Sequence, residues 1–236
     1  SLGSYMALGF QHILEGWDHL AFVLALLLLA RSLKEVALLV TTFTVAHSVT
    51  LALAATGLVR PSTPQVEIII AFSIALVAAE NCWALGGRRR SVQLTFVAAP
   101  CVAMGLASAG YGTLRAAAWL GLALFSFCHF ELLKNTQRPQ RLRALLAFAF
   151  GLYHGFGFAG VLMEVELPQG RLLPALFGFN VGVEVGQLLV VALVFPLLAA
   201  LGRLAEGRWR QLVAEVSSAA VLGLGLYWVM VRSWGP

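Results

Sequence analysis

The chain has 236 residues, of which 60% are hydrophobic and only 11% are charged, and its mean hydropathy is +0.86. This composition excludes an ordinary soluble domain, in which about 25% of the residues are charged. The formal net charge is +5. The basic residues follow the pattern of a membrane topology, so the excess does not indicate a nucleic-acid partner. We therefore expect an integral membrane protein in contact with the lipid bilayer.

Eight apolar stretches are long enough to cross a hydrocarbon layer about 30 Å thick, which needs roughly 20 residues per helix. They lie near residues 5–30, 35–58, 64–86, 91–110, 112–133, 143–163, 172–201 and 211–231. The sequence thus predicts an all-α, polytopic transmembrane bundle of about eight helices. No soluble domain fits between them, so residues 1–236 are expected to form a single transmembrane domain.

The basic residues predict the orientation of this bundle. With these eight stretches, the connections after the first, third, fifth and seventh hold twelve of the sixteen lysines and arginines. The positive-inside rule places these connections in the cytoplasm and both termini outside. An external amino terminus usually requires a leader or an external segment ahead of Ser1 in the natural chain.

The first stretch contains four ionisable side chains within "GFQHILEGWDHLAF", residues 9–22. On one continuous helix His12, Glu15 and His19 would form a single stripe, with Asp18 to one side. The later stretches add polar stripes of their own. These comprise Thr44, His47 and Ser48; Ser73, Glu80 and Asn81; His154; and Asn180, Glu184 and Gln187, with Gly178, Gly182 and Gly186 opposite the last group.

Ionisable side chains at this depth need partners. A carboxylate at the bilayer centre costs about 3 kcal/mol, so those in the apolar stretches must face one another, water or an ion. For Thr44, Ser48, Ser73 and Gln187 we favour hydrogen bonding between helices. The histidines and carboxylates instead form a ligand set that suits Zn²⁺, Ni²⁺ or Co²⁺, and a proton relay is the other use of such groups. The candidate metal ligands are His12, Glu15, Asp18, His19, His47, Glu80, His154 and Glu184.

Five ordered blocks carry a family resemblance. They are "HILEGWDHLAF" (12–22), "FTVAHSVTL" (43–51), "FSIALVAAEN" (72–81), "FGLYHGFGFAG" (150–160) and "FNVGVEVGQ" (179–187). Together they resemble the HupE/UreJ family of bacterial membrane proteins, particularly its second branch. The resemblance implies a nickel or cobalt permease of the bacterial inner (plasma) membrane, connected with hydrogenase and urease. It implies a metal-site role for every candidate ligand above except Glu15. Residues 87–142 depart from the family pattern and are predicted to be an added two-helix segment.

Three functions remain open at this point. The leading hypothesis is a secondary permease for a divalent transition metal, with no catalytic residues. The alternative is an intramembrane zinc-dependent hydrolase acting on a lipid or a peptide, with Glu15 or Glu80 activating water. A further alternative is a proton-coupled sensor or channel. A permease needs a polar route to both faces, whereas a hydrolase needs one wet pocket. A homo-oligomer is compatible with each of the three.

Overall fold

The computed structural model describes residues 1–30, 32–158, 172–203 and 208–235. Within these ranges the chain forms nine helices and no strand, which confirms the predicted all-α class. The helices are α1 (Leu2–Glu15), α2 (Trp17–Leu28), α3 (Leu33–Ala55), α4 (Thr63–Leu85), α5 (Arg90–Ser108), α6 (Ala116–Asn135), α7 (Pro139–Gly157), α9 (Leu172–Leu201) and α10 (Arg208–Trp234).

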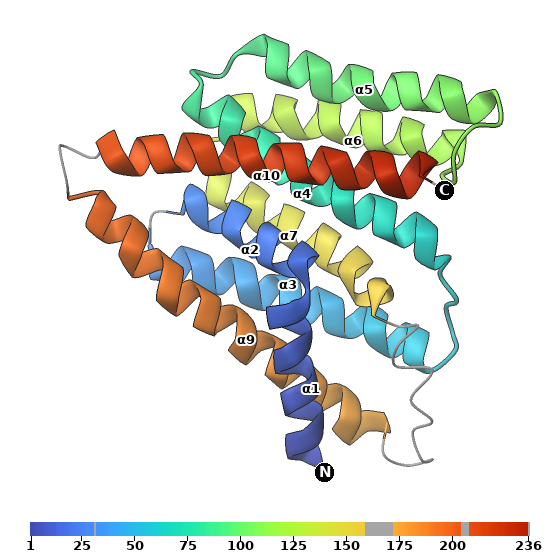
Figure 1. Ribbon diagram of the computed structural model, residues 1–236, viewed down its shortest axis with the longest axis vertical. Helices are drawn as coiled ribbons and strands as arrows, with labels where there is room; N and C mark the ends of the chain where they lie inside the picture. Colours follow the sequence, from blue (N-terminus) through green and yellow to red (C-terminus); the bar gives the residue numbers. More distant parts are fainter. Residues whose placement is uncertain (31, 159–171, 204–207, 236) are drawn as a thin grey trace.

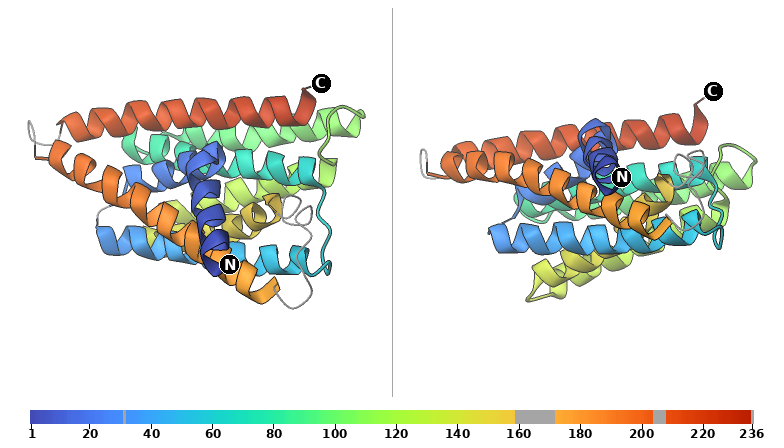
Figure 2. Two further views of the ribbon diagram at one scale, coloured as in Figure 1. Left: turned by 60° about the horizontal axis from the view of Figure 1, so that its bottom comes forward. Right: turned by 90° about the horizontal axis from the view of Figure 1, so that it is seen from below.

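Most of the long helices run side by side, and two elements depart from this direction (Figure 1). Helix α9 crosses the bundle obliquely, and α1 runs across the long helices, so that it is seen nearly end-on in the right view of Figure 2. Helices α5 and α6 pair with each other along one edge, where the two-helix addition was predicted. In the described part of the chain, α3, α4, α5, α6, α9 and α10 are long and apolar enough to cross a membrane.

Helix α4 forms the centre of the bundle. Most of its residues are buried, as expected for a helix surrounded by others, and Ala75 lies where Gly225 lets α10 approach its backbone. The outer helices instead expose large apolar side chains, including Leu120, Leu124 and Phe127 on α6 and Leu189, Leu193 and Leu197 on α9. Exposed apolar surface of this extent suits contact with lipid. The protein is therefore an integral membrane protein.

The first predicted span is not one helix, and that prediction was wrong. Gly16 adopts an extended conformation, and its N–H donates to the carbonyl of His12 at 3.0 Å, ending α1, while its own carbonyl accepts from Leu20 and starts α2. The break requires a close approach that only glycine permits. A Cβ on Gly16 would lie 2.6 Å from the His12 carbonyl oxygen and 2.9 Å from His19 Nδ1.

The break also changes how many helices qualify as full spans by length and hydropathy. Neither α1 nor α2 is long enough to cross a membrane alone, and α7, the predicted sixth span, carries Arg141 and Arg143 in its first turns. The predicted end of that sixth span, residues 159–163, lies outside the described residues. Six helices of the described part, not eight, have the length and hydropathy of a full span.

The basic connections meet at one end of the bundle, which we call the basic end. Residues from all four of them, including Leu29, Arg88, Thr136 and Gly202, surround one cavity there. At the opposite end the backbone N–H of Thr113 donates to the carbonyl of Ser233 at 3.0 Å. The four basic connections therefore lie at one end, as predicted, and the connection between α5 and α6 lies at the other. Which end faces the cytoplasm, and with it the external position of both termini, stays a prediction.

Candidate metal site

Four of the five histidines in the chain converge from four different helices. Ligand nitrogens of His12, His19 and His47 all lie within 4.8 Å of one another, and the ring of His154 lies 5.3 Å from that of His19. His19, His47 and His154 are buried, whereas His12 is partly exposed. We call these four residues the histidine cluster.

The helix break brings the first two histidines into contact. On a continuous helix, seven positions separate two Cα atoms by about 10 Å along the axis. In the structure the rings of His12 and His19 are 4.6 Å apart and meet edge to face. The expected pairing of these residues is therefore present, but the expected cause, a single helical stripe shared with Glu15, is not. Glu15 is exposed at the end of α1.

Hydrogen bonds set the orientation of the His47 ring and leave its lone pair on Nε2. The amide nitrogen of Asn180 donates to the carbonyl of Leu176 at 2.8 Å, so that the amide oxygen is left as an acceptor. His47 Nδ1 lies 3.2 Å from this oxygen and must donate to it. The neutral ring then carries its lone pair on Nε2.

His154 has the same arrangement. Its Nδ1 lies 2.9 Å from the carbonyl oxygen of Phe150, which can only accept, so Nδ1 donates and Nε2 holds the lone pair. Metal-binding histidines are oriented in this way, with the second ring nitrogen donating to a carbonyl or an amide oxygen.

All four Nε2 atoms of the histidine cluster are buried and have no hydrogen-bond partner among the described residues. Buried polar atoms are normally satisfied, because an unmade hydrogen bond costs about 1–3 kcal/mol. Three of these histidines have ligand nitrogens within 4.8 Å of one another, with His154 beside them, and this arrangement fits a bound cation. Imidazole nitrogen suits Zn²⁺, Ni²⁺ and Co²⁺.

Phenylalanine rings close the cluster on two sides. Toward the basic end, the ring of Phe43 lies 4.9 Å and that of Phe22 lies 5.1 Å from the ring of His154. Toward the opposite end, Phe158 lies 4.2 Å from His12 and stacks on Phe179 at 4.5 Å. The histidine cluster is thus separated from both ends of the bundle by aromatic side chains.

Polar side chains continue from the cluster along the seam between α3 and α9. Thr44 donates to the Gln187 amide oxygen at 2.9 Å, and Thr41 donates to Glu184 Oε1 at 2.6 Å. Glu184 Oε2 is buried without a partner among the described residues. Thr41 lies six positions before His47 on α3, which is about 9 Å along the helix axis. The carboxylate that Thr41 binds is therefore about 9 Å from the cluster, toward the basic end.

Glycines on the other face of α9 let α1 approach closely. A Cβ on Gly182 would overlap the carbonyl oxygen of Met6, and a Cβ on Gly9 of α1 would overlap that of Phe179. Gly178 and Gly186 also face α1. The glycine stripe is therefore a packing face, as the sequence predicts, and it holds His12 beside α9.

Two predicted ligands lie away from the histidine cluster. One nitrogen of Arg232, near the end of α10, donates to both carboxylate oxygens of Asp18, at 2.9 and 3.1 Å. Glu80 accepts from Arg143 at 2.6 Å and lies 2.9 Å from Nε2 of His129. The expectation that all the carboxylates meet the histidines does not hold for these two.

Sequence reasoning missed the partners of these carboxylates. The basic residues were interpreted only through the membrane topology, and His129 was not among the candidate ligands. One signal was available, because a carboxylate in an apolar segment requires a cation. The sequence does not say which one, since Glu80 and Arg143 are 63 positions apart.

A family model described as HupE / UreJ protein matches the chain at residues 1–127 and 95–232. The two matched segments together reach from the first residue to the last turn of α10. They overlap at residues 95–127, inside the segment predicted to be an addition, and the addition itself stays a prediction. No curated protein and no solved structure matched the chain.

Proposed function

The chain belongs to the HupE/UreJ family, which is connected with nickel and cobalt transport, and we propose that it is a secondary permease for a divalent transition-metal ion. The ion is the transported substrate, and the histidine cluster is its binding site inside the membrane. One observation carries this proposal. Ligand nitrogens of His12, His19 and His47 lie within 4.8 Å of one another, and His154 lies beside His19. The Nε2 atoms of all four are buried without a hydrogen-bond partner among the described residues, and in His47 and His154 they carry the lone pair.

The surroundings of the cluster fit a site that opens alternately to the two ends. Phe158 and Phe179 cover the histidines on one side, and Phe22 and Phe43 cover them on the other. Movement of either pair would open the site in one direction only. The seam toward the basic end provides oxygen ligands for the departing ion, among them the unpartnered oxygen of Glu184.

Neither of the carboxylates predicted as the general base of a hydrolase lies beside the histidine cluster. A zinc hydrolase needs a carboxylate beside the metal-bound water. Glu80 instead accepts from Arg143 and lies in the wall of a separate cavity, and Glu15 is exposed. The arrangement therefore supports transport over hydrolysis. The expected location is the plasma membrane of a bacterium.

Metal binding and uptake test the proposal together. The purified protein in detergent should bind Ni²⁺ or Co²⁺, and the protein in liposomes should accumulate the same ion. Changing both His47 and His154 to Ala removes two of the four ligands and should abolish stoichiometric binding and uptake. The fifth histidine provides the matched control. His129→Gln keeps a hydrogen-bond donor beside Glu80 and should leave binding in detergent unchanged.

Three results would contradict the proposal. Unchanged metal content in the double variant would exclude the histidine cluster as the site. Equal loss in His129→Gln would point to a general effect on folding. Metal binding without any uptake into liposomes would favour a sensor over a permease.

A further inference from the structure

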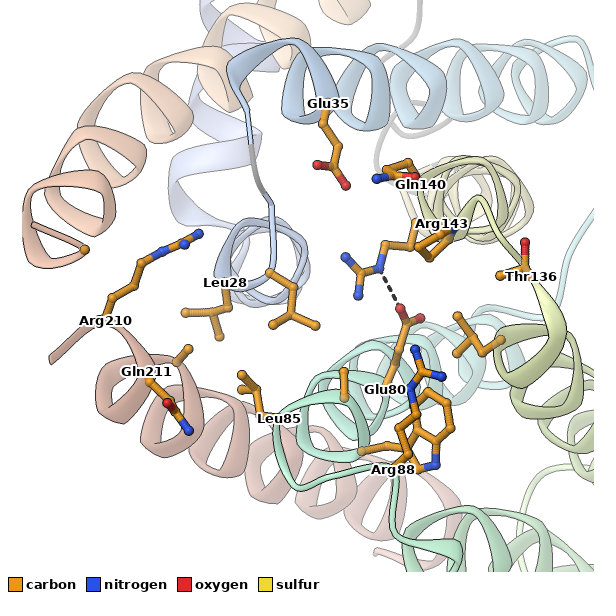
Figure 3. Close-up of a pocket in the computed structure, with 17 residues that line it drawn as sticks. Leu28, Glu35, Glu80, Leu85, Arg88, Thr136, Gln140, Arg143, Arg210 and Gln211 are labelled. Atoms are coloured by element: carbon orange, nitrogen blue, oxygen red, sulfur yellow. Dashed lines mark hydrogen bonds and ion pairs between the residues drawn. The ribbon is translucent and has the colours of Figure 1, made fainter. Parts of the chain in front are cut away.

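A cavity of about 490 Å³ opens at the basic end of the bundle, separate from the histidine cluster. The ends of α2 and α4 and the starts of α3, α7 and α10 surround it, and no histidine lines it. Figure 3 shows Arg88, Arg143 and Arg210 reaching toward this cavity from different elements. Its volume falls in the range of small-molecule sites, about 300–1,000 Å³.

The charges of the cavity favour an anion. Its lining contains three arginines and two carboxylates, Glu35 and Glu80. Both oxygens of Glu80 are already engaged, one by Arg143 and the other by His129. A cation would meet three guanidinium groups here, so the cavity does not resemble a second metal site.

The buried polar atoms of its lining that have no partner among the described residues are N–H donors. Arg210 uses one nitrogen for the carbonyl of Ala30, and its Nε has no partner among the described residues. Trp83 lines the cavity, is 2% exposed, and has an indole nitrogen that is likewise unpartnered. The guanidinium of Arg88 lies over the Trp83 ring at 5.4 Å. The matching ligand has acceptor atoms and negative charge.

Helix α7 adds a further donor group. It begins at Pro139 in the wall of the cavity, and no side chain caps it. Pro139 has no N–H, and the N–H of Arg141 donates to the carbonyl of Arg138, so the donor nearest the cavity is the N–H of Gln140. The first backbone N–H groups of a helix lack intrahelical partners and carry a partial positive charge, which attracts phosphate. Guanidinium groups also bind phosphate oxygens, through pairs of parallel hydrogen bonds.

We propose that this cavity binds a phosphate group, recognised by Arg88, Arg210 and the start of α7. Two sources offer the same chemistry, namely the headgroup of an anionic phospholipid and a soluble phosphate compound. The site does not depend on the proposed transport function, because it shares no residue with the histidine cluster.

Titration of the purified protein in a non-ionic detergent free of phosphate tests this inference. Inorganic phosphate and short-chain phosphatidylglycerol are titrated in separate calorimetric experiments, at constant ionic strength because surface charges respond to salt. Binding of at least one probe is expected. Arg88→Gln combined with Arg210→Gln should weaken it at least tenfold. Arg88→Gln alone should also weaken it, and the variant should still fold, because this exposed side chain contributes only its contact with the Trp83 ring.

The control removes two arginines from the same end. Arg89 and Arg90 are exposed, do not line the cavity and lie outside α7, so their double change to Gln should leave the affinity within twofold. Binding of phosphatidylglycerol alone assigns the site to a lipid headgroup, and binding of inorganic phosphate assigns it to a soluble compound. The proposal is overturned if neither probe binds, if the Arg88 variants bind normally, or if the control loses affinity equally.

Discussion

Single side chains orient the histidine cluster, and Asn180 is the clearest case. Asn180 is not a candidate metal ligand. Its amide group nevertheless sets which nitrogen of His47 holds the proton. The role depends on two consecutive hydrogen bonds, because the carbonyl of Leu176 fixes the orientation of the amide and the amide then fixes the ring. A polar residue with this function is a positioning residue.

Replacing Asn180 with Leu should weaken metal binding by tenfold to a hundredfold, the usual effect of losing the partner of a metal-bound histidine. Titration with Ni²⁺ or Co²⁺ in detergent measures the change. Gln187→Leu is the matched control. It removes an amide group of the same helix, but this amide accepts a hydrogen bond from Thr44 and, among the described residues, none from a histidine. It should lower thermal stability and spare affinity. Equal affinity losses in the two variants would mean that Asn180 acts only through packing.

Asp18 should act through Arg232 and not as a ligand. The pair is partly exposed, at 24% and 21% of the two side chains, so its contribution to stability should be about 1 kcal/mol or less. It nevertheless ties the start of α2, next to His19, to the end of α10. Asp18→Arg alone should reduce metal affinity, and adding Arg232→Asp should restore it. An affinity that stays low in the exchanged pair would return Asp18 to the ligand set.

Glu184 should matter for movement of the ion along the seam. Glu184→Gln keeps the size of the side chain and an oxygen for Thr41 but removes the negative charge. Uptake into liposomes should fall, and thermal unfolding should change little. Measuring metal content alongside uptake separates binding from passage. A variant that transports normally but is poorly folded would show that Glu184 only holds α9 against α3.

At the scale of elements, the break between α1 and α2 builds the site. A continuous helix would keep His12 and His19 two turns apart, and one of them would leave the cluster. A break at this depth leaves backbone groups that lipid cannot satisfy, and such backbone persists only when protein surrounds it. The close packing of α1 on the glycine face of α9 provides that protection.

Gly16→Ala tests the break directly. The added methyl group must displace either the His12 carbonyl or the ring of His19, and overpacking of this kind costs about 1–3 kcal/mol. Metal affinity and thermal stability should therefore both fall. Gly223→Ala on α10 is the control, because a Cβ there meets open space. If Gly16→Ala binds metal like the parent protein, the geometry of the break does not determine the site.

At the scale of the whole molecule, the two ends of the bundle differ in chemistry. The basic end gathers the arginines around the proposed phosphate site, and the histidine cluster lies closer to the other end. His47 is about 21 Å from the start of α3 and about 12 Å from its end. The route from the histidine cluster to the end of α3 is therefore shorter than the route to the basic end.

Topology can be measured with reporter fusions. From the distribution of the basic residues, both termini should be external, so a reporter at the carboxyl terminus should be active outside the cytoplasm. A second fusion in the connection between α6 and α7 should report the cytoplasm. A cytoplasmic signal from the carboxyl terminus would reverse the assignment of the basic end.

The sequence by itself determined the class of the protein, its apolar helices, the alternation of its basic connections and the identity of its family. These properties follow from composition and local order. The cost of burying charge in lipid also made His12, His19, His47 and His154 candidates before any fold was known. The sequence also predicted the glycine face of α9, because small residues four positions apart share one side of a helix.

Only the tertiary structure decided which of the ionisable residues belong together. Helical periodicity treats a segment as continuous, so it could not predict a break at Gly16, which depends on the packing of α1 against α9. It also could not separate Asp18 and Glu80 from the histidines, because their partners, Arg232 and Arg143, are distant in the chain. A charge in an apolar helix requires some partner, but only the arrangement of the helices in space determines which one it meets.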